Sequence, residues 1–153
     1  MANLLDDIQD RTFAHATKAT LRAYPESRRL VGAQLTGYLD RRSIGVISSV
    51  RLDGRPHSAP GTYIRRAATF WLPTFDATVR ERNVSATPWL VLVVAEGDGS
   101  EHVAVIVEGT GTVIPAAAVP HEVTAAFAKD WASTWLRLDA ERLLSYADEG
   151  ITA

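Results

Sequence analysis

The feature that most constrains the fold is a run of short β-branched segments separated by turn residues, which fills the middle of the chain. Residues 44–52 are typical of a strand. The Asp-Gly dipeptide at 53–54 predicts a two-residue hairpin loop, because glycine tolerates the positive φ that such loops need. Residues 57–64 are predicted to return as the next strand. Because Pro56 and Pro60 cannot donate to a sheet, this strand should lie at an edge or contain a bulge.

Three more strand patterns follow. Residues 69–72 form a short one, and the nearly continuous apolar run at 89–95 indicates a buried strand. A Gly-Asp-Gly turn at 97–99 leads into residues 102–113, where apolar side chains occupy both faces of the predicted strand. Gly109-Thr110-Gly111, within this strand, has the composition of a β-bulge rather than of a phosphate-binding loop. The middle of the chain therefore predicts a series of antiparallel hairpins.

Helical patterns flank these strands. They cover residues 3–16, the segment after Pro25 that carries Leu30, Val31, Leu35 and Tyr38, and residues 120–129. At the end of the chain we expect a last short strand at 136–138 and a terminal helical turn at 140–146. Strands that arrive by hairpins, with helices on the periphery, favour a mainly β antiparallel barrel over a doubly wound α/β sheet.

The length of 153 residues fits one domain. We divide it into an N-terminal helical segment at 1–40, a barrel core at 42–113, and a C-terminal helix with closing elements at 119–148. These bounds follow the change from helical to strand periodicity and back.

Composition narrows the function classes. The chain has no cysteine, which excludes disulfides and thiolate metal sites and permits a cytoplasmic location. A net charge of −2 argues against nucleic-acid binding through overall charge. No apolar run approaches the roughly 20 residues that a membrane-spanning helix needs, and the acidic N-terminus does not resemble a secretory signal. We therefore expect a cytoplasmic protein without nucleic-acid or membrane partners.

A candidate phosphate site lies between the third strand and the next segment. Thr78-Val79-Arg80-Glu81 matches the capping box Ser/Thr-x-x-Glu, so a helix should begin at Thr78. The free N–H groups and the dipole of a first helical turn favour an anion, and the Thr74 and Thr78 hydroxyls and the Arg80 guanidinium could add contacts. The alternative is that Thr78 only caps the helix and Arg80 is solvated.

The segment His57-Ser58-Ala59-Pro60-Gly61 is a strand of mostly small residues. Its backbone could lie close to a flat ring, because small side chains do not block the approach. A tight corner of the barrel explains the same residues equally well. The four histidines show no spacing typical of a metal site, and we predict none.

The order of these segments resembles the pyridoxamine-phosphate-oxidase-like family of FMN-binding split β-barrels, which are antiparallel and Greek-key-like. The resemblance covers about residues 42–113. IGVISSVRLDGRPHSAPG resembles the family's first hairpin, TFWLPT its third strand with a terminal Thr, and TVRERNV its Ser-Arg-Lys-x-x-Asn-Leu phosphate helix. A weaker similarity lies in RLDAERLLSYADEG near the end of the chain.

The resemblance implies a set of flavin-binding residues. Thr78 and Arg80 correspond to the residues that bind the flavin phosphate, and Thr74 to the Thr that faces the ribityl and phosphate region. His57, Ser58, Ala59 and Pro60 correspond to the strand whose backbone lies beside the flavin ring. The chain departs from the motif at Val79, where the family has a basic residue, so that Arg82 or Arg65 could replace the missing contact. The family's vitamin-specific substrate residues are not recognisable.

The resemblance also implies a function: an oxidoreductase that binds FMN non-covalently at the interface of a homodimer and acts on a small organic molecule. No catalytic side chain is predicted, since the flavin itself carries the redox chemistry. One alternative is a deazaflavin-dependent reductase using an 8-hydroxy-5-deazaflavin coenzyme. Its polyanionic tail could contact Arg65, Arg66, Arg80 and Arg82. Another is a non-enzymatic dimeric barrel that binds flavin, haem or a tetrapyrrole.

Overall fold

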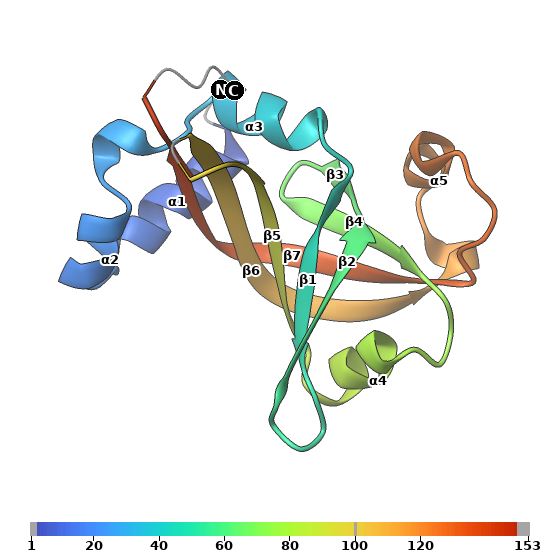
Figure 1. Ribbon diagram of the computed structural model, residues 1–153. Helices are drawn as coiled ribbons and strands as arrows, with labels where there is room; N and C mark the ends of the chain where they lie inside the picture. The colour runs from blue at the N-terminus through green and yellow to red at the C-terminus, as the bar shows by residue number, and fades with distance from the viewer. Residues whose placement is uncertain (1–2, 100, 150–153) are drawn as a thin grey trace.

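The computed structural model describes residues 3–99 and 101–149 and contains a seven-stranded antiparallel sheet in the order β2-β1-β5-β6-β7-β4-β3 (Figure 1). Its strands are β1 (Ile44–Val50), β2 (Pro56–Thr62), β3 (Ile64–Arg66), β4 (Thr69–Thr74), β5 (Trp89–Gly97), β6 (His102–Pro115) and β7 (Thr134–Ala147). With helices packed at its periphery, this is the mainly β split-barrel architecture expected from the sequence. The proline-containing strand β2 lies at an edge, as predicted.

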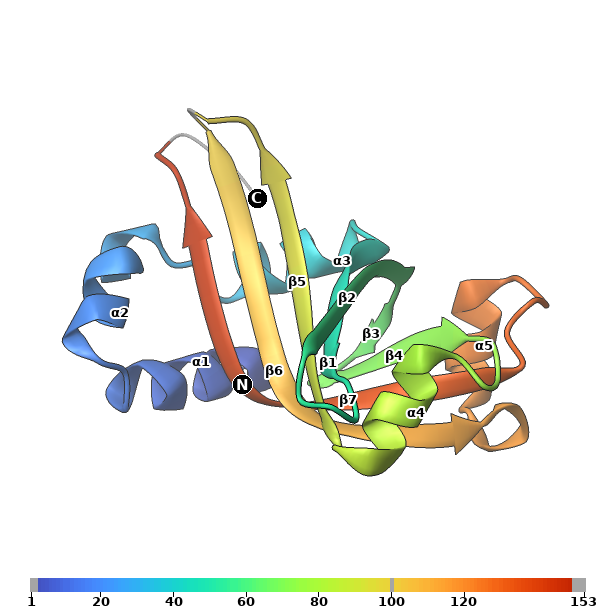
Figure 2. The ribbon, with the colours of Figure 1, turned by 60° about the horizontal axis from the view of Figure 1, so that its bottom comes forward.

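A single residue links the two edge strands of the sheet. The two edge strands, β2 and β3, are consecutive in the chain and are joined only by Tyr63. A sheet whose opposite edges are linked so closely must curl, and Figure 2 shows this curvature in the long strands. Tyr63 is buried, its N–H donates to the Ser43 carbonyl (2.9 Å), and its hydroxyl donates to the Leu39 carbonyl (2.6 Å). The corner is therefore held by packing and by hydrogen bonds.

The first hairpin has a three-residue loop instead of the predicted two-residue one. Arg51 N–H donates to the Arg55 carbonyl (2.8 Å), which leaves residues 52–54 in the loop. Gly54 has φ +86° and its N–H donates to the Arg51 carbonyl (2.9 Å). This geometry is a turn followed by a left-handed glycine, the usual form of a three-residue hairpin loop.

The largest correction concerns the end of the chain. The predicted strand at 136–138 and helical turn at 140–146 are in fact a single strand, β7, that pairs with β6 along its length. The pairing contains a bulge: Gly109 faces Ala140 and Glu108 faces Arg142, which leaves Glu141 as an extra residue. Before the bulge the even-numbered Leu136 and Leu138 are buried, and after it the odd-numbered Leu143 is buried. Because the two-residue alternation is interrupted in this way, the apolar spacing in the sequence resembles that of a helix.

The sequence placed a bulge at Gly109-Thr110-Gly111; the register shift does fall at Glu108/Gly109, but the extra residue, Glu141, lies opposite, on β7. A Cβ on Gly109 would lie 1.9 Å from the Asp139 carbonyl oxygen, so no other residue fits the close approach of β6 to β7.

Five α-helices surround the sheet within the described residues: α1 (Leu4–Ala14), α2 (Lys18–Ala23), α3 (Ala33–Asp40), α4 (Val79–Ala86) and α5 (His121–Phe127). Short 3₁₀ turns lie at Glu26–Arg28 and Ala116–Ala118. The sequence pattern after Pro25 placed Leu30 and Val31 in a helix, but that helix begins only at Ala33. Leu30 is buried from an extended segment and Val31 is exposed. Within the described part of the chain, no helix is long and apolar enough to span a membrane.

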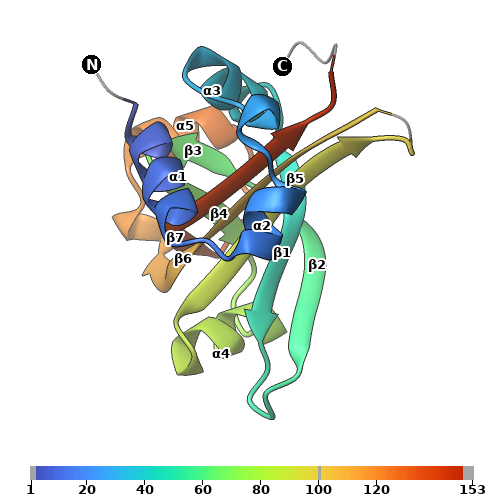
Figure 3. The same cartoon turned by 90° about the vertical axis from the view of Figure 1, so that its left-hand side faces the viewer.

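The helices lie in two groups. α1 packs against β7, and α1 and α2 cover one side of the molecule (Figure 3). α4 and α5 lie toward the other side, where β4 ends (Figure 1). This separation leaves the N-terminus of α4 beside β2 and β4, which is where the candidate phosphate residues were predicted.

Candidate functional site

The start of α4 is built by a capping arrangement. The Thr78 hydroxyl accepts a hydrogen bond from the Glu81 N–H (3.2 Å), which confirms Thr78 as the N-cap. The Glu81 carboxylate accepts from the N–H of Ala77 (2.6 Å), one residue earlier than in the standard capping box. Ala77 has φ +58°, a conformation uncommon for a non-glycine residue, and this bends the chain between β4 and the helix.

A second hydroxyl lies beside the cap. Thr74 ends β4, is 6% exposed, and its Oγ1 lies 3.5 Å from Oγ1 of Thr78. Of the first-turn N–H groups of α4, that of Glu81 is engaged by the Thr78 hydroxyl, and those of Val79 and Arg80 have no acceptor within the helix. The loop from Thr74 to Thr78 therefore brings two hydroxyls to the positive end of a helix.

Arg80 extends from α4 to the edge strand. Its Nη2 donates to the Pro60 carbonyl (3.4 Å), and a Cβ on Gly61 would lie 3.1 Å from its Nη1. The missing side chain at Gly61 thus lets the guanidinium lie against β2. The Nε of Arg80 is buried and has no hydrogen-bond partner among the described residues, and burial lowers the pKa of this guanidinium.

His57 approaches from β2. Side chains of this strand alternate, with His57, Ala59 and Gly61 partly buried on one face and Ser58 and Pro60 exposed on the other. The Nδ1 of His57 is buried and lacks a hydrogen-bond partner in the part of the chain that the structure describes. Desolvation, followed by the positive charges of Arg51 and Arg80, lowers the pKa of His57.

These side chains line one pocket of about 430 Å³, which we call the α4 pocket. It is lined by His57, Thr74, Ala77, Thr78, Val79, Arg80 and Arg82. None of these residues is acidic, and two of them, His57 and Arg80, carry buried nitrogens that have no partner in the described part of the chain. Unpaired buried nitrogens beside a helix N-terminus suit a multiply charged oxyanion such as a phosphate, and the Glu81 carboxylate at this helix start is engaged by the Ala77 N–H.

The structure divides the remaining predicted residues of β2. Ala59 shares the face of His57, whereas the Ser58 hydroxyl lies on the opposite face, 2.7 Å from the hydroxyl of Ser48 on β1. Pro60 takes part through its carbonyl, which accepts from Arg80. The structure therefore brings His57, Thr74, Thr78 and Arg80 into one pocket, while the side chains of Ser58 and Pro60 lie outside it.

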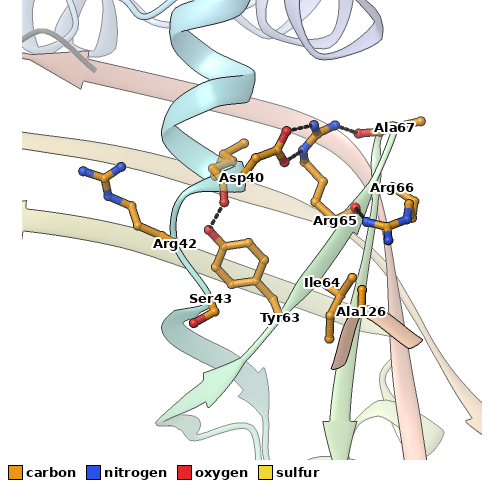
Figure 4. A pocket seen from close by; sticks show the side chains of 10 residues that line it. Asp40, Arg42, Ser43, Tyr63, Ile64, Arg65, Arg66, Ala67 and Ala126 are labelled. Carbon is orange, nitrogen blue, oxygen red and sulfur yellow. Dashed lines mark hydrogen bonds and ion pairs between the residues drawn. The ribbon is translucent and has the colours of Figure 1, made fainter. Parts of the chain in front are cut away.

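The basic cluster suggested by sequence is divided as well. Arg65 and Arg66 line a separate pocket beside the end of α3, shown in Figure 4. Both Nε and Nη2 of Arg65 donate to the Asp40 carboxylate, at 2.8 and 2.6 Å. Of the four arginines, only Arg80 and Arg82 line the α4 pocket. Arg65 is engaged elsewhere and does not replace the basic residue missing at Val79.

One structural residue of the site was not singled out from sequence. Asn83 is 3% exposed, and its Nδ2 donates to the hydroxyl of Ser49 on β1 (3.0 Å), which ties α4 to the sheet. An asparagine followed by Val84 on an otherwise polar helix was the available signal. Among the described residues, no group of three or more His, Asp or Glu could hold a metal ion.

Comparison with known proteins finds one matching family model. Residues 32–146 match the family model of pyridoxamine 5'-phosphate oxidase. None of the curated proteins compared with the sequence matches it.

Solved structures share the fold at low sequence identity. A conserved hypothetical protein from Mycobacterium tuberculosis has a TM-score of 0.67 and 15% identity, covering 81% of this chain and 89% of that one. An FAD-binding protein from Mesorhizobium loti has 0.64 and 18%, covering 80% and 98%. The haem storage protein HutZ from Vibrio cholerae has 0.63 and 12%, covering 78% and 95%. The family match over most of the chain, together with the shared fold, shows that this chain belongs to the pyridoxamine 5'-phosphate oxidase-like split-barrel family.

Proposed function

We propose that this protein is a flavin-dependent oxidoreductase that holds FMN non-covalently in the α4 pocket and acts on a small organic substrate. The observation that carries the proposal is the convergence of Thr74, Thr78 and Arg80 at the N-terminus of α4, with two buried nitrogens that have no partner among residues 3–99 and 101–149. A phosphate monoester offers three acceptor oxygens and up to two negative charges, which matches those donors.

The residues of the pocket would divide the work as follows. The hydroxyls of Thr74 and Thr78, the first-turn N–H groups of α4 and the Arg80 guanidinium would bind the phosphate. The backbone of β2, beside the small residues Ala59 and Gly61, would support the ring. The flavin supplies the hydride and electron transfer when bound, and the protein supplies binding and orientation.

FMN is preferred over a deazaflavin coenzyme because the basic cluster is divided between two pockets. A polyanionic tail would gain from four neighbouring arginines, whereas only Arg80 and Arg82 line the α4 pocket, and Arg65 already binds Asp40. Haem binding remains the non-enzymatic alternative, supported by the similarity to the haem storage protein of Vibrio cholerae in fold.

We also propose that the protein is a homodimer. A row of apolar residues crosses five strands on the sheet face opposite the main core: Pro60, Val46, Val93, Ile106 and Leu144 pair in register. Val46 is 43% exposed and neighbouring Ile44 is 64% exposed. Contiguous exposed apolar surface of this kind is typical of protein interfaces. Light scattering should give twice the monomer mass, and Val46→Arg should reduce it to the monomer mass.

The function is tested first by titrating the purified protein with FMN, riboflavin, a deazaflavin and haem. Saturable quenching of FMN fluorescence, with weaker binding of riboflavin because it lacks the phosphate, is expected. Reduction of the bound flavin by a nicotinamide donor would support an oxidoreductase. Binding of haem alone, or of the deazaflavin alone, would overturn the FMN assignment.

A further inference from the structure

His57 has a buried ring nitrogen that takes no part in the proposed phosphate contacts of Thr74, Thr78 and Arg80. Its Nδ1 has no hydrogen-bond partner in residues 3–99 and 101–149, although its side chain lines the α4 pocket. Buried polar atoms in folded proteins are paired in nearly all cases, and a site that is left unpaired points to a missing ligand. The position of His57 on β2 also differs from that of the helix residues, so it approaches the pocket from a second direction.

We propose that the imidazole of His57 is a proton-dependent ligand of the cofactor phosphate, so that binding of the phosphate is accompanied by uptake of one proton from solvent at His57. The inference rests on the proposed function. It assigns His57 a side-chain role, in addition to the backbone contact with the flavin ring expected from the sequence.

The charges around His57 explain why the proton arrives together with the ligand. Arg51, which follows β1, and Arg80 on α4 act on the imidazole, and Arg82 of α4 lines the same pocket. The Glu81 carboxylate of α4 accepts from the Ala77 N–H in the pocket wall. The groups contributed by the other elements are neutral: Thr74 ends β4, Thr78 precedes α4, and Ser49 faces His57 in the β1–β2 register. This cationic and partly desolvated setting lowers the pKa of His57 and favours the neutral imidazole.

A phosphate reverses this balance. Two negative charges near the imidazole favour its protonated form, and imidazolium then offers an N–H at each ring nitrogen. Protonated His57 therefore adds a positive charge beside Arg80 and Arg82. Val79 provides no charge in this pocket, and Arg65 is paired with Asp40 elsewhere. By linkage, FMN affinity should strengthen as the pH falls from about 8 to about 6.5, by at most about tenfold per pH unit.

The experiment is isothermal titration calorimetry of FMN binding at about pH 7 in two phosphate-free buffers with different ionisation enthalpies. The dependence of the measured enthalpy on the buffer gives the number of protons exchanged. We expect an uptake approaching one proton with FMN and none with riboflavin. The cofactor phosphate, with a second pKa of about 6, would only release a small fraction of a proton, which has the opposite sign.

The matched variants are His57→Asn, which keeps a polar group near the position of Nδ1 but cannot titrate, and His121→Asn, which changes an exposed histidine on α5. His57→Asn should abolish the proton uptake and weaken FMN binding about tenfold at pH 6.5, with riboflavin binding unchanged. His121→Asn should behave as the wild type. Absence of proton uptake in the wild type would overturn the role of His57 even if the His57 variant does not fold.

Failure of the inference is separable from failure of the proposed function. Wild-type protein that binds FMN more tightly than riboflavin, but without proton uptake, keeps the phosphate site and removes His57 from it. Wild-type protein that binds neither FMN nor riboflavin overturns both.

Discussion

Buried polar atoms are hydrogen-bonded at the α1 end, the region where α1 packs against β7, whereas two buried nitrogens of the α4 pocket have no partner among the described residues. At the α1 end, Gln9 and Ser145 are almost fully buried, Gln9 Nε2 donates to the Leu30 carbonyl (2.8 Å), and Leu30 N–H donates to the Ser145 hydroxyl (3.0 Å). Nearby, the Thr12 hydroxyl accepts from the N–H of Leu143 (3.0 Å). In the α4 pocket, by contrast, the buried nitrogens of His57 and Arg80 have no partner among the described residues.

The difference separates a structural region from a binding region. A buried polar atom without a partner costs about 1–3 kcal/mol, so the α1 end is arranged to avoid that cost. In the α4 pocket this free-energy cost is present, and a ligand that supplies acceptors would remove the cost. In Figure 2, α1 lies toward the left of the sheet and α4 toward the right, so side chains in the two regions can be changed separately.

The largest effect is expected from Arg80→Ala. If this side chain binds the phosphate, its removal should weaken FMN binding by about 1.5–3 kcal/mol, because a hydrogen bond to a charged group is lost. Fluorescence titration measures the change. Arg65→Ala is the matched control, since Arg65 lies in another pocket and should leave FMN affinity unchanged. Equal affinities of the wild type and Arg80→Ala would remove Arg80 from the site.

The converse perturbation is Ser145→Ala at the α1 end. It removes the acceptor of the Leu30 N–H and the hydroxyl that donates to Gln9, so the free energy of unfolding should fall by about 1–3 kcal/mol. Urea denaturation measures this loss. The exposed Ser27→Ala control should change stability by less than about 0.5 kcal/mol. FMN affinity should stay at the wild-type value in both variants, and a matching loss of affinity would contradict the separation of the two regions.

Thr78→Ala tests a residue with both a structural and a binding role, because its hydroxyl caps α4 and Thr78 lines the pocket. We expect a loss of about 1 kcal/mol in stability from the missing cap, together with weaker FMN binding. Thr78→Ser keeps the hydroxyl and should restore both properties. A stability loss in Thr78→Ala with unchanged FMN affinity would mean that Thr78 acts only as a cap.

Val79→Arg should sharpen the comparison by adding charge to the pocket. Val79 is the second residue of the Thr-Val-Arg-Glu motif and lines the α4 pocket near the helix N-terminus. A cation there should strengthen FMN binding by about 0.3–1 kcal/mol at low salt while leaving riboflavin binding unchanged. An equal gain for both ligands would show that the added side chain contacts the ring and not the phosphate.

The smallest effect concerns the pH dependence of stability in the free protein. Because the pKa of folded His57 lies below its ordinary value of about 6.5, the unfolded chain binds more protons between those two values. Stability should therefore fall as the pH drops from 6.5 toward 5, and thermal unfolding should record a shallower decline in His57→Asn. An identical decline in both proteins would show that other groups dominate this range.

Local patterns in the sequence were sufficient for most elements of the fold. β-branched runs and turn dipeptides predicted β1, β2, β4, β5 and β6 but not the short β3, the prolines placed β2 at an edge, and the capping box placed the start of α4 at Thr78. Each of these depends on residues close together in the chain. The end of β7 was misread because Glu141, an extra residue opposite β6, interrupts the alternation, and only pairing with β6 makes it a strand.

The sequence by itself determined which residue types could bind an anion: hydroxyls at a helix start, an arginine within its first turn, and a strand of small residues nearby. Only the tertiary structure decided which of them meet. Tyr63 joins the two edges of the sheet, Gly61 admits Arg80 against β2, and Asp40 holds Arg65 in a different pocket. The buried Nδ1 of His57 finds no partner among the residues that the structure describes. The physical reason is that burial and pairing arise between segments distant in the chain, and no local pattern contains that information.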